Sequence, residues 1–319
     1  MILGKFMPPH LGHVFAVEFA RRFADPLTVL VCSLDREPIS GRSRFEWMRE
    51  LFPSCDVRHV TDDLPQEPAD HPDFWVIWRS VVLANTPAPP RYVFASEPYG
   101  FKLAEVLGAQ FIPVDIARSL VPVSGTAIRT QPMANWQYLP ACVRPHFVKR
   151  VCVFGPESTG KTTLARDLAT HFRTVWVAEF ARGLLDHKNG QCDPADIELI
   201  ARGQPAAEDA LARHANRVLF CDTDVLTTTI WADELFGRCP KWVRSLADQR
   251  TYDLYLLLDV DVPWVDDRQR YLPHRRREFF EKCEAALRRC GRPYVVLRGG
   301  WNERFEAAVR ATERLLHQS

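Results

Sequence analysis

The chain contains 319 residues, of which 46% are hydrophobic and 25% are charged, and its formal net charge is +1. These values are ordinary for a globular protein of about two domains, and they give no sign of a basic surface for nucleic acid or membranes. No apolar run approaches the roughly 20 residues that span a bilayer, and no signal-peptide pattern follows Met1. The nine cysteines form no C-x-x-C pair, so we expect free thiols in a reducing, cytoplasmic compartment.

The chain opens with a strand, a turn and a helix. Residues 1–5 have the pattern of a strand, and residues 14–23 have the spacing of a helix with a broad apolar face. The turn between them carries an H-x-G-H motif formed by His10, Gly12 and His13. Two imidazoles at a helix start can face one point, and a glycine between them permits close approach of a phosphate. The plain alternative is a pair of structural histidines.

Strands and helices continue to alternate through the first half. Further strands are predicted over 27–32, 57–60, 91–96 and 111–114, with helices over 42–52 and 74–83 and another that ends at 107. This alternation predicts a parallel sheet in an α/β domain, with ligands bound at the carboxyl ends of the strands. Trp78 could stack on a flat ring, although a tryptophan in an amphipathic helix more often belongs to the core.

A second loop-to-helix junction follows the fifth strand and contains Ser124, Thr126 and Arg129. Two hydroxyls, the amides of a helix start and one guanidinium can together bind phosphates. The alternative is an N-capped surface helix. Residues 136–149 contain prolines and aromatic residues, which predicts a short, stiff connection to a second domain.

The second half opens with the P-loop pattern G-x-x-x-x-G-K-T. It lies between a strand over 150–154 and a helix over 164–172, which is the order of elements that the pattern requires. Its backbone amides can wrap a triphosphate, Lys161 can reach the β- and γ-phosphates, and the Thr162 hydroxyl can hold Mg²⁺. The other loop residues expected to contact ATP are Gly155, Glu157, Ser158, Thr159, Gly160 and Thr163.

Acidic residues follow two later strands of the second half. Glu179 follows a strand over 175–178, and Asp222 and Asp224 follow a strand over 218–221. Such carboxylates can orient or deprotonate an acceptor hydroxyl, or complete a Mg²⁺ site, whereas capping and surface ion pairs are the alternatives.

An arginine-rich segment lies near the end of the second half. Residues 264–277 have the character of a lid whose arginines could close over a transferring phosphate; the alternative is a solvated run of charges. A last strand is predicted over 294–297 and a closing helix over 301–317.

The whole set of motifs, from Met1 to about Arg314, resembles the NadR family of bifunctional nicotinamide mononucleotide (NMN) adenylyltransferases and ribosylnicotinamide kinases. In the first half the resemblance is carried by Gly4–His13, Ser96–Gly100 and Val123–Arg129, and in the second by Gly155–Thr163, Glu179–Arg182, Cys221–Asp224 and Val262–Arg268. It implies two parallel-sheet domains: a Rossmann-like H-x-G-H nucleotidylyltransferase over residues 1–147 and a P-loop ribosylnicotinamide kinase over residues 148–319.

The resemblance also implies a reaction sequence. ATP would phosphorylate the 5′-hydroxyl of nicotinamide riboside with the help of Mg²⁺, and the resulting NMN would attack a second ATP to give NAD and pyrophosphate. The implied catalytic residues are His10, His13, Lys161, Glu179 and Asp222. Beyond the P-loop, the implied ATP contacts are Lys5, Phe6, Gly12, Ser124, Thr126, Arg129 and Arg268, and the implied contacts to the acceptor are Trp78, Arg182 and Asp224.

Two departures from the family are visible. Some members carry an N-terminal DNA-binding domain, but His10 stands too close to Met1 for one, so we expect no nucleic-acid partner. The isoleucine of the second signature is Val123, a mild change. The expected partners are small molecules, namely nicotinamide riboside, NMN and ATP, with no membrane; the sequence leaves a homo-oligomer open.

Two other functions compete with this hypothesis. The P-loop kinase could act on a different small acceptor, because the motifs recognise phosphate and not nicotinamide. The chain could also be a nucleotide sensor without turnover, but the complete P-loop and H-x-G-H elements favour an enzyme.

Overall fold

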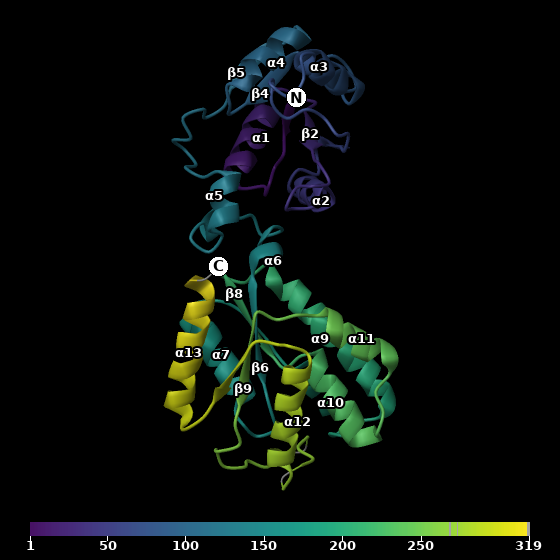
Figure 1. Ribbon diagram of the computed structural model, residues 1–319, viewed down its shortest axis with the longest axis vertical. Helices are drawn as coiled ribbons and strands as arrows, with labels where there is room; N and C mark the ends of the chain where they lie inside the picture. Colours follow the sequence, from purple (N-terminus) through teal and green to yellow (C-terminus); the bar gives the residue numbers. More distant parts are fainter. Residues whose placement is uncertain (268, 273, 318–319) are drawn as a thin grey trace. The chain divides into compact units, whose positions relative to one another are not determined.

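The computed structural model describes residues 1–267, 269–272 and 274–317. The chain divides into two compact units, Met1–Val143 and Arg144–Ser319 (Figure 1). The boundary lies four residues before the predicted one, after residue 147, because the short helix α6 (Arg144–Phe147) packs against helix α9 of the second unit. Among the described residues, no helix is both long enough and apolar enough to cross a membrane.

The first unit is built on a five-stranded parallel sheet with the strand order β3-β2-β1-β4-β5. The strands are β1 (Ile2–Gly4), β2 (Thr28–Cys32), β3 (Asp56–Val60), β4 (Tyr92–Ala95) and β5 (Gln110–Pro113). The helices are α1 (Leu11–Phe23), α2 (Gly41–Leu51), α3 (Phe74–Ala84), α4 (Tyr99–Leu107) and α5 (Gly125–Thr130), followed by the 3₁₀ turn η1 (Trp136–Tyr138).

Alternation along the central strands of this sheet separates two cores. Val29 and Val31 of β2 belong to the core under α1 and α2, whereas Leu30 and Cys32 belong to the core under α3 and α4. A strand that is apolar on both faces is the pattern of a buried parallel strand. Helices therefore cover both faces of the sheet, and the carboxyl ends of its strands remain the edge where a ligand can enter.

The second unit has another five-stranded parallel sheet, with the order β10-β9-β6-β8-β7. Its strands are β6 (Lys149–Phe154), β7 (Trp176–Val177), β8 (Val218–Asp222), β9 (Leu254–Leu258) and β10 (Tyr294–Leu297). Its longer helices are α7 (Lys161–His171), α8 (Phe180–Asp186), α9 (Pro194–Ala212), α10 (Val225–Phe236), α11 (Lys241–Gln249), α12 (Arg276–Arg289) and α13 (Trp301–His317).

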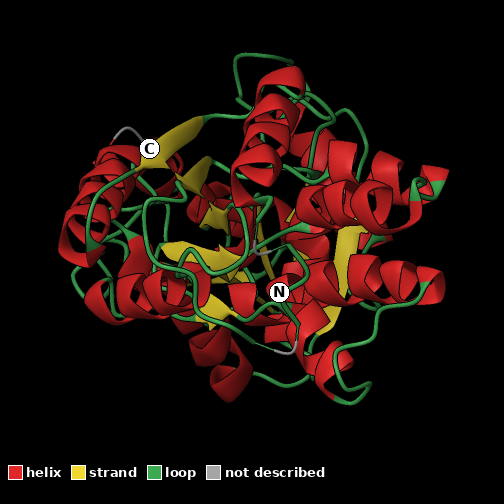
Figure 2. Cartoon of the chain, turned by 90° about the horizontal axis from the view of Figure 1, so that it is seen from below, coloured by secondary structure: helices red, strands yellow, loops and turns green. Residues whose placement is uncertain are grey.

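The central strand β6 again faces two cores. Val151 and Val153 pack into a cluster with α7 and α13, while on the other face the Phe154 ring meets the Tyr255 ring edge-on, with centroids 5.4 Å apart. Figure 1 shows α7 and α13 on one side of this sheet and α9, α10 and α12 on the other. Figure 2 shows most of the strands lying among the helices. The P-loop follows β6 directly, so this strand sets its position.

Candidate active sites

A cleft of about 980 Å³ lies at the carboxyl ends of the strands in the first unit. Its wall includes the predicted residues Lys5, Phe6, His10, Gly12, His13, Trp78, Ser124, Thr126 and Arg129, together with Asp115 and Arg118. The structure thus brings the H-x-G-H motif and the second junction, more than 100 residues apart in sequence, to one site. A cleft of this size is within the range of small-molecule and cofactor sites.

The two histidines of the motif form a reciprocal cap at the start of α1. The Gly12 backbone N–H donates to His10 Nδ1 at 3.1 Å, and the His10 backbone N–H donates to His13 Nδ1 at 3.3 Å. The rings stack with centroids 3.7 Å apart. Because each Nδ1 accepts a hydrogen bond, the neutral ring must carry its proton on Nε2. Each imidazole therefore offers an Nε2–H donor to the cleft.

Burial keeps this pair neutral. It lowers the pKa of His10 to about 4, with a smaller effect from the Arg118 guanidinium. Burial lowers the pKa of His13 well below its usual value, and the charges of His10 and Arg118 act in the same direction. The motif thus presents two uncharged donors at neutral pH. Arg118 itself was not predicted as a site residue; it lies in a turn with φ of 51° and has no motif around it that would single it out.

The second junction is held against the H-x-G-H element by Arg129. This guanidinium donates to the Met7 carbonyl oxygen and, at 3.1 Å, to the Thr126 hydroxyl. Ser124 caps α5 by accepting from the Ala127 N–H at 3.1 Å. A Cβ at Gly125 would lie 2.6 Å from the Met7 carbonyl oxygen, so glycine is required for this approach. The capping alternative is therefore correct for Ser124 Oγ, and the same segment still lines the cleft.

Two other predicted residues of the cleft have structural partners. Lys5 pairs with Glu37 at 3.0 Å, and Glu37 also pairs with the fully buried Arg44. Trp78 is 9% exposed and donates from Nε1 to the Pro65 carbonyl oxygen at 3.0 Å, while its ring lines the cleft. Trp78 is thus both a core residue and part of the cleft wall.

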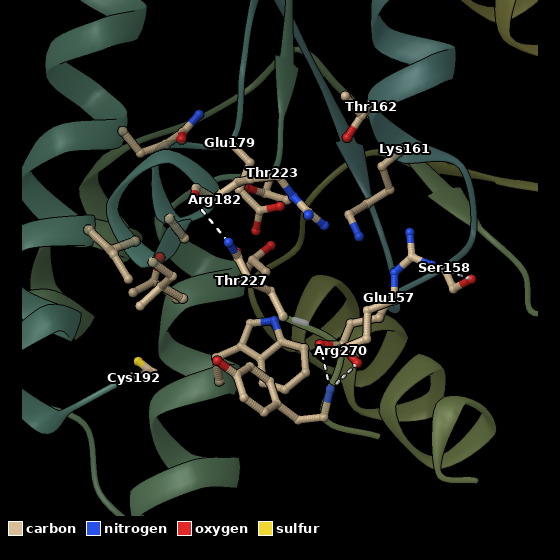
Figure 3. Close-up of a pocket in the computed structure, with 18 of the residues that line it drawn as sticks. Glu157, Ser158, Lys161, Thr162, Glu179, Arg182, Cys192, Thr223, Thr227 and Arg270 are labelled. Carbon is tan, nitrogen blue, oxygen red and sulfur yellow. Dashed lines mark hydrogen bonds between the residues drawn. The ribbon is translucent and has the colours of Figure 1, made fainter. Parts of the chain in front are cut away.

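A narrower cavity of about 180 Å³ lies at the P-loop of the second unit. Figure 3 shows Lys161 and Thr162 on one side of it, with Glu179, Arg182 and Cys192 on the other. The loop backbone takes left-handed φ angles of 133° at Gly155, 55° at Ser158 and 86° at Gly160. Alternating turns of this kind direct successive N–H groups toward an anion.

The reactive side chains of the P-loop already have partners that hold them near the cavity. Lys161 Nζ donates to the Pro156 carbonyl oxygen at 2.9 Å, and the Thr162 hydroxyl donates to Asp222 Oδ2 at 2.5 Å. Trp301 packs on the outside of Gly160, where an added Cβ would meet its ring at 2.4 Å. The loop is therefore fixed on its outer side and open on its inner side.

The Asp222 carboxylate is buried, and only one of its two oxygens accepts a hydrogen bond. Its Oδ1 has no hydrogen-bond partner among the described residues. Burial, and next the neighbouring charge of Glu179, raise the pKa of Asp222 to about 6, although Lys161 opposes the shift. A buried carboxylate oxygen without a partner beside a P-loop threonine has the donor set that suits Mg²⁺, which keeps waters and phosphate oxygens as its other ligands.

Asp224 does not line the cavity, contrary to its predicted contact with the acceptor. It caps α10 by accepting from the Thr227 N–H at 2.9 Å, and it accepts from the Tyr255 hydroxyl at 2.8 Å. Both carboxylate oxygens are thus committed inside the core, where Asp224 is 2% exposed. Thr223, which has φ of 68°, lines the cavity instead.

The predicted lid segment contacts the P-loop through two loop residues. Glu157 accepts from the Tyr271 and Leu272 amides at 2.9 and 3.2 Å. Ser158 Oγ accepts from the Val265 N–H at 2.7 Å. Glu157 and Ser158 therefore fasten this segment beside the phosphate loop.

The arginines of the segment have different roles. Arg276 donates to the Ser158 carbonyl oxygen, and Arg270 lines the cavity. Arg275 and Arg277, both about half exposed, pair with the largely buried carboxylates of Glu234 and Asp259, so they serve neither as a solvated run of charges nor as part of the cavity wall. Arg268, a predicted ATP contact, lies outside the described residues.

Arg182, a predicted contact to the acceptor, lines the cavity and is tied to the same segment. Its guanidinium pairs with Asp267 at 2.7 Å. Glu179 also lines the cavity, at the N-cap of α8, where its side chain accepts no hydrogen bond from the helix start. Its carboxylate is thus available to a ligand.

Several residues of this cavity wall were not predicted from the sequence, and three of them bear on ligand binding. Trp231 and Tyr271 face it, with ring centroids 6.2 Å apart in an edge-on arrangement. Gln204 of α9 is a third wall residue, and it is 1% exposed. They come from separate segments and share no motif, so only the fold brings them together.

Comparisons with known proteins agree with this architecture. A family model described as an AAA domain matches residues 150–304, which contain the P-loop cavity. The trifunctional NAD biosynthesis/regulator protein NadR of Salmonella typhimurium LT2 is 30% identical over 295 residues, or 85% of this chain and 71% of that protein. The protein of the same name from Escherichia coli K12 is 30% identical over 304 residues, or 88% of this chain and 73% of its own.

Two solved structures share the fold over almost the full chain. A crystal structure of NadR protein in complex with NR matches with a TM-score of 0.81 at 23% identity. Another, in complex with NAD and AMP-PNP, matches with a TM-score of 0.78 at 24% identity. Each alignment covers 99% of this chain and 95% of the other, so the succession of two α/β units is common to all three.

Proposed function

The chain belongs to the NadR family of NAD biosynthesis proteins, and from this premise we propose that it forms NAD in two ATP-dependent steps. The second unit transfers a phosphoryl group from ATP to nicotinamide riboside, giving NMN and ADP. The first unit transfers an adenylyl group from ATP to NMN, giving NAD and pyrophosphate. The observation that carries this proposal is the presence of two separate strand-to-helix anion sites, one in each unit.

In the kinase step the P-loop amides and Lys161 bind the phosphates of ATP. The nicotinamide ring lies against Trp231 and Tyr271, because flat aromatic walls favour a flat cationic ring. Glu179 orients the 5′-hydroxyl and accepts its proton as the oxygen–phosphorus bond forms and the bond to ADP breaks. The support for Glu179 over Asp222 is geometric: Glu179 lines the cavity, whereas Asp222 is held behind it by Thr162.

Mg²⁺ fits the second unit through Thr162 and the unpaired Oδ1 of Asp222. When bound, the ion neutralises charge on the phosphate oxygens. Arg182 lies on the wall across from Lys161 and adds a second cation to the site (Figure 3). Together these groups position the γ-phosphoryl group, and positioning with charge stabilisation supplies most of the catalysis in phosphoryl transfer.

In the adenylyl-transfer step a phosphate oxygen of NMN attacks the α-phosphorus of ATP, and the bond to pyrophosphate breaks. No covalent intermediate with the protein is required. The Nε2–H donors of His10 and His13 stabilise the charge that develops on the α-phosphoryl and bridging oxygens. Ser124, Thr126 and Arg129 bind the leaving pyrophosphate at the second junction, since hydroxyls and a guanidinium at a helix start suit its charge.

The proposal is tested by incubating the protein with nicotinamide riboside, ATP and Mg²⁺ and following products by chromatography. We expect NMN to appear first and then NAD, with one pyrophosphate released per NAD. A chain that phosphorylates another nucleoside but not nicotinamide riboside would contradict the kinase assignment. A chain that binds ATP without forming either product would contradict the enzyme assignment as a whole.

A further inference from the structure

Gln204 of α9 is a buried polar residue in the wall of the kinase cavity. It lies on the face of α9 that also carries Ile197 and Ile200, at a spacing of one and two helical turns. Its side chain is 1% exposed. A polar group at such a position is costly unless its hydrogen bonds are satisfied.

One half of the Gln204 amide is satisfied within the protein. Oε1 accepts from the Phe180 backbone N–H at 2.9 Å. This contact fixes the orientation of the amide, because only the oxygen can accept from an N–H group. The Nε2 group has no hydrogen-bond partner in the described part of the chain. Leu185 and Leu235 of the cavity wall offer only side-chain carbon, and the Thr227 and Thr228 hydroxyls in the same wall donate to Asp224.

The position of the amide indicates which part of the acceptor it meets. Phe180 follows Glu179 directly, so the bond from Phe180 to Gln204 places the amide beside the carboxylate that orients the sugar. The Phe180 ring packs on Gly203, where an added Cβ would lie 2.3 Å from it, and this contact fastens the start of α8 to α9. The aromatic pair Trp231 and Tyr271 supplies a separate surface for the ring of the substrate.

We propose that Gln204 determines specificity for the sugar of the acceptor: its Nε2–H donates to a secondary hydroxyl of the ribose. The assignment rests on the nucleoside kinase activity proposed above and names the group that distinguishes ribose from deoxyribose. A hydroxyl oxygen satisfies the buried donor, whereas an acceptor that lacks this hydroxyl leaves Nε2 unpaired. Sites built to bind a hydroxyl reject analogues without it for this reason.

The test compares nicotinamide riboside with its 2′-deoxy and 3′-deoxy analogues by kcat/KM. In the wild-type protein we expect one of the two analogues to be worse by about 30-fold, in line with the cost of an unpaired buried donor. In Gln204→Met, which keeps the length of the side chain without its amide, we expect this ratio to fall to about 3-fold or less. KM for ATP should stay close to the wild-type value, which also reports that the kinase unit is folded; Gln204→Leu serves if Gln204→Met is insoluble.

The control is Ile197→Val, which removes one methyl group from the same wall two turns before Gln204 and keeps both the amide and its contact with Phe180. It should change the turnover of all three nucleosides by a common factor and preserve the ratio between them. Three results would overturn the assignment: no deoxy penalty in the wild type, a wild-type ratio retained in Gln204→Met, or a ratio lost equally in Ile197→Val. If the wild type does not phosphorylate nicotinamide riboside at all, the proposed kinase function fails first, and that result is distinct from all three.

Discussion

Each of the two proposed anion sites lies at a turn from a strand into a helix. The side chains around the two turns differ almost completely. In the first unit a wide cleft holds two neutral imidazoles, and their Nε2–H groups are its donors. In the second unit a narrow cavity is lined by a lysine, and a partly unpaired carboxylate lies behind its wall. The segment fastened to Glu157 and Ser158 borders this cavity. In the proposed reactions the turn between strand and helix binds phosphate in both units, and the surrounding side chains set which phosphorus is attacked.

The difference follows from the nucleophile that each site must activate. A phosphate of NMN is already an anion, so the first site needs donors that relieve charge and needs no base. A sugar hydroxyl carries a proton, so the second site needs a carboxylate near it. Acidic groups then repel the phosphates of ATP, which explains why cations accompany them in the second site.

The largest expected effect is the loss of the kinase step in Lys161→Ala. Removing the charge that the P-loop lysine places on the phosphates should lower NMN formation by about 100-fold or more. Adenylyl transfer from ATP to supplied NMN should be unchanged, because Lys161 belongs to the other unit. Separate assays with nicotinamide riboside and with NMN measure the two steps. Equal damage to both in a folded variant would contradict the assignment of two sites.

The reciprocal change is His13→Ala. Loss of one preorganised donor to the developing oxyanion should lower adenylyl transfer by about 100-fold while kinase activity is retained. Because His13 Nδ1 also accepts the His10 N–H, His13→Asn is a useful companion that keeps a polar cap without the imidazole Nε2–H. We expect His13→Asn to restore stability but not turnover. Full activity in either variant would exclude His13 from the reaction.

Asp222→Asn should stabilise the fold of the second unit and abolish the Mg²⁺ dependence of the kinase step. Burial raises the pKa of Asp222 to about 6, so its stabilising contribution is present below the ordinary pKa near 4 and lost as pH rises through 6. At pH 7.5 the variant should therefore gain about 2 kcal/mol in unfolding free energy, and the gain should vanish near pH 4. Thermal unfolding across this range measures it. A variant less stable than the wild type at pH 7.5 would contradict the account.

His10→Asn should give the opposite pH trend in the first unit. Burial lowers the pKa of His10 to about 4, so the contribution of the neutral ring is present above the ordinary pKa near 6.5 and lost as pH falls through 4. Asparagine is a good N-cap and does not titrate in this range. Relative to the wild type, the variant should gain about 1–2 kcal/mol between pH 7 and pH 5. No pH dependence of this difference would exclude a buried neutral imidazole.

The smallest expected effect concerns the aromatic wall of the second cavity. Trp231→Leu keeps an apolar side chain but removes the flat face, so KM for nicotinamide riboside should rise by about 5-fold to 10-fold, the value of roughly one stacking contact. KM for NMN in the other step should not change. An unchanged KM for the riboside would mean that Trp231 does not contact the ring.

The sequence predicted the sites better where function depends on the backbone than where it depends on packing. The H-x-G-H turn and the P-loop were both predictable, because an apolar strand followed by glycines forms a recognisable local pattern in the sequence. The helices α10 and α12 were not anticipated. Most of α10 is buried, including Thr227–Thr229, so it lacks the apolar stripe that identifies a surface helix. The arginine run at 275–277 leads directly into α12 and resembled a loop of charges.

The errors among the site residues have the same origin. Asp222 and Asp224 are two residues apart, and a catalytic role was predicted for the first and an acceptor contact for the second. In the structure Asp222 reaches the P-loop threonine, whereas Asp224 caps a helix inside the core. Which of the two carboxylates reaches the P-loop depends on the residue at which α10 begins. Trp231, Tyr271 and Gln204 become neighbours only through the packing of α9, α10 and the lid segment. No local pattern in the sequence records such a contact.

The claim that each unit holds its own ATP is tested most directly by binding stoichiometry. Calorimetric titration with a non-hydrolysable ATP analogue and Mg²⁺ should give two sites per chain in the wild type, with one site lost or strongly weakened in Lys161→Ala and the other retained. A single site per chain at saturation in the wild type, abolished by that one substitution, would contradict the account.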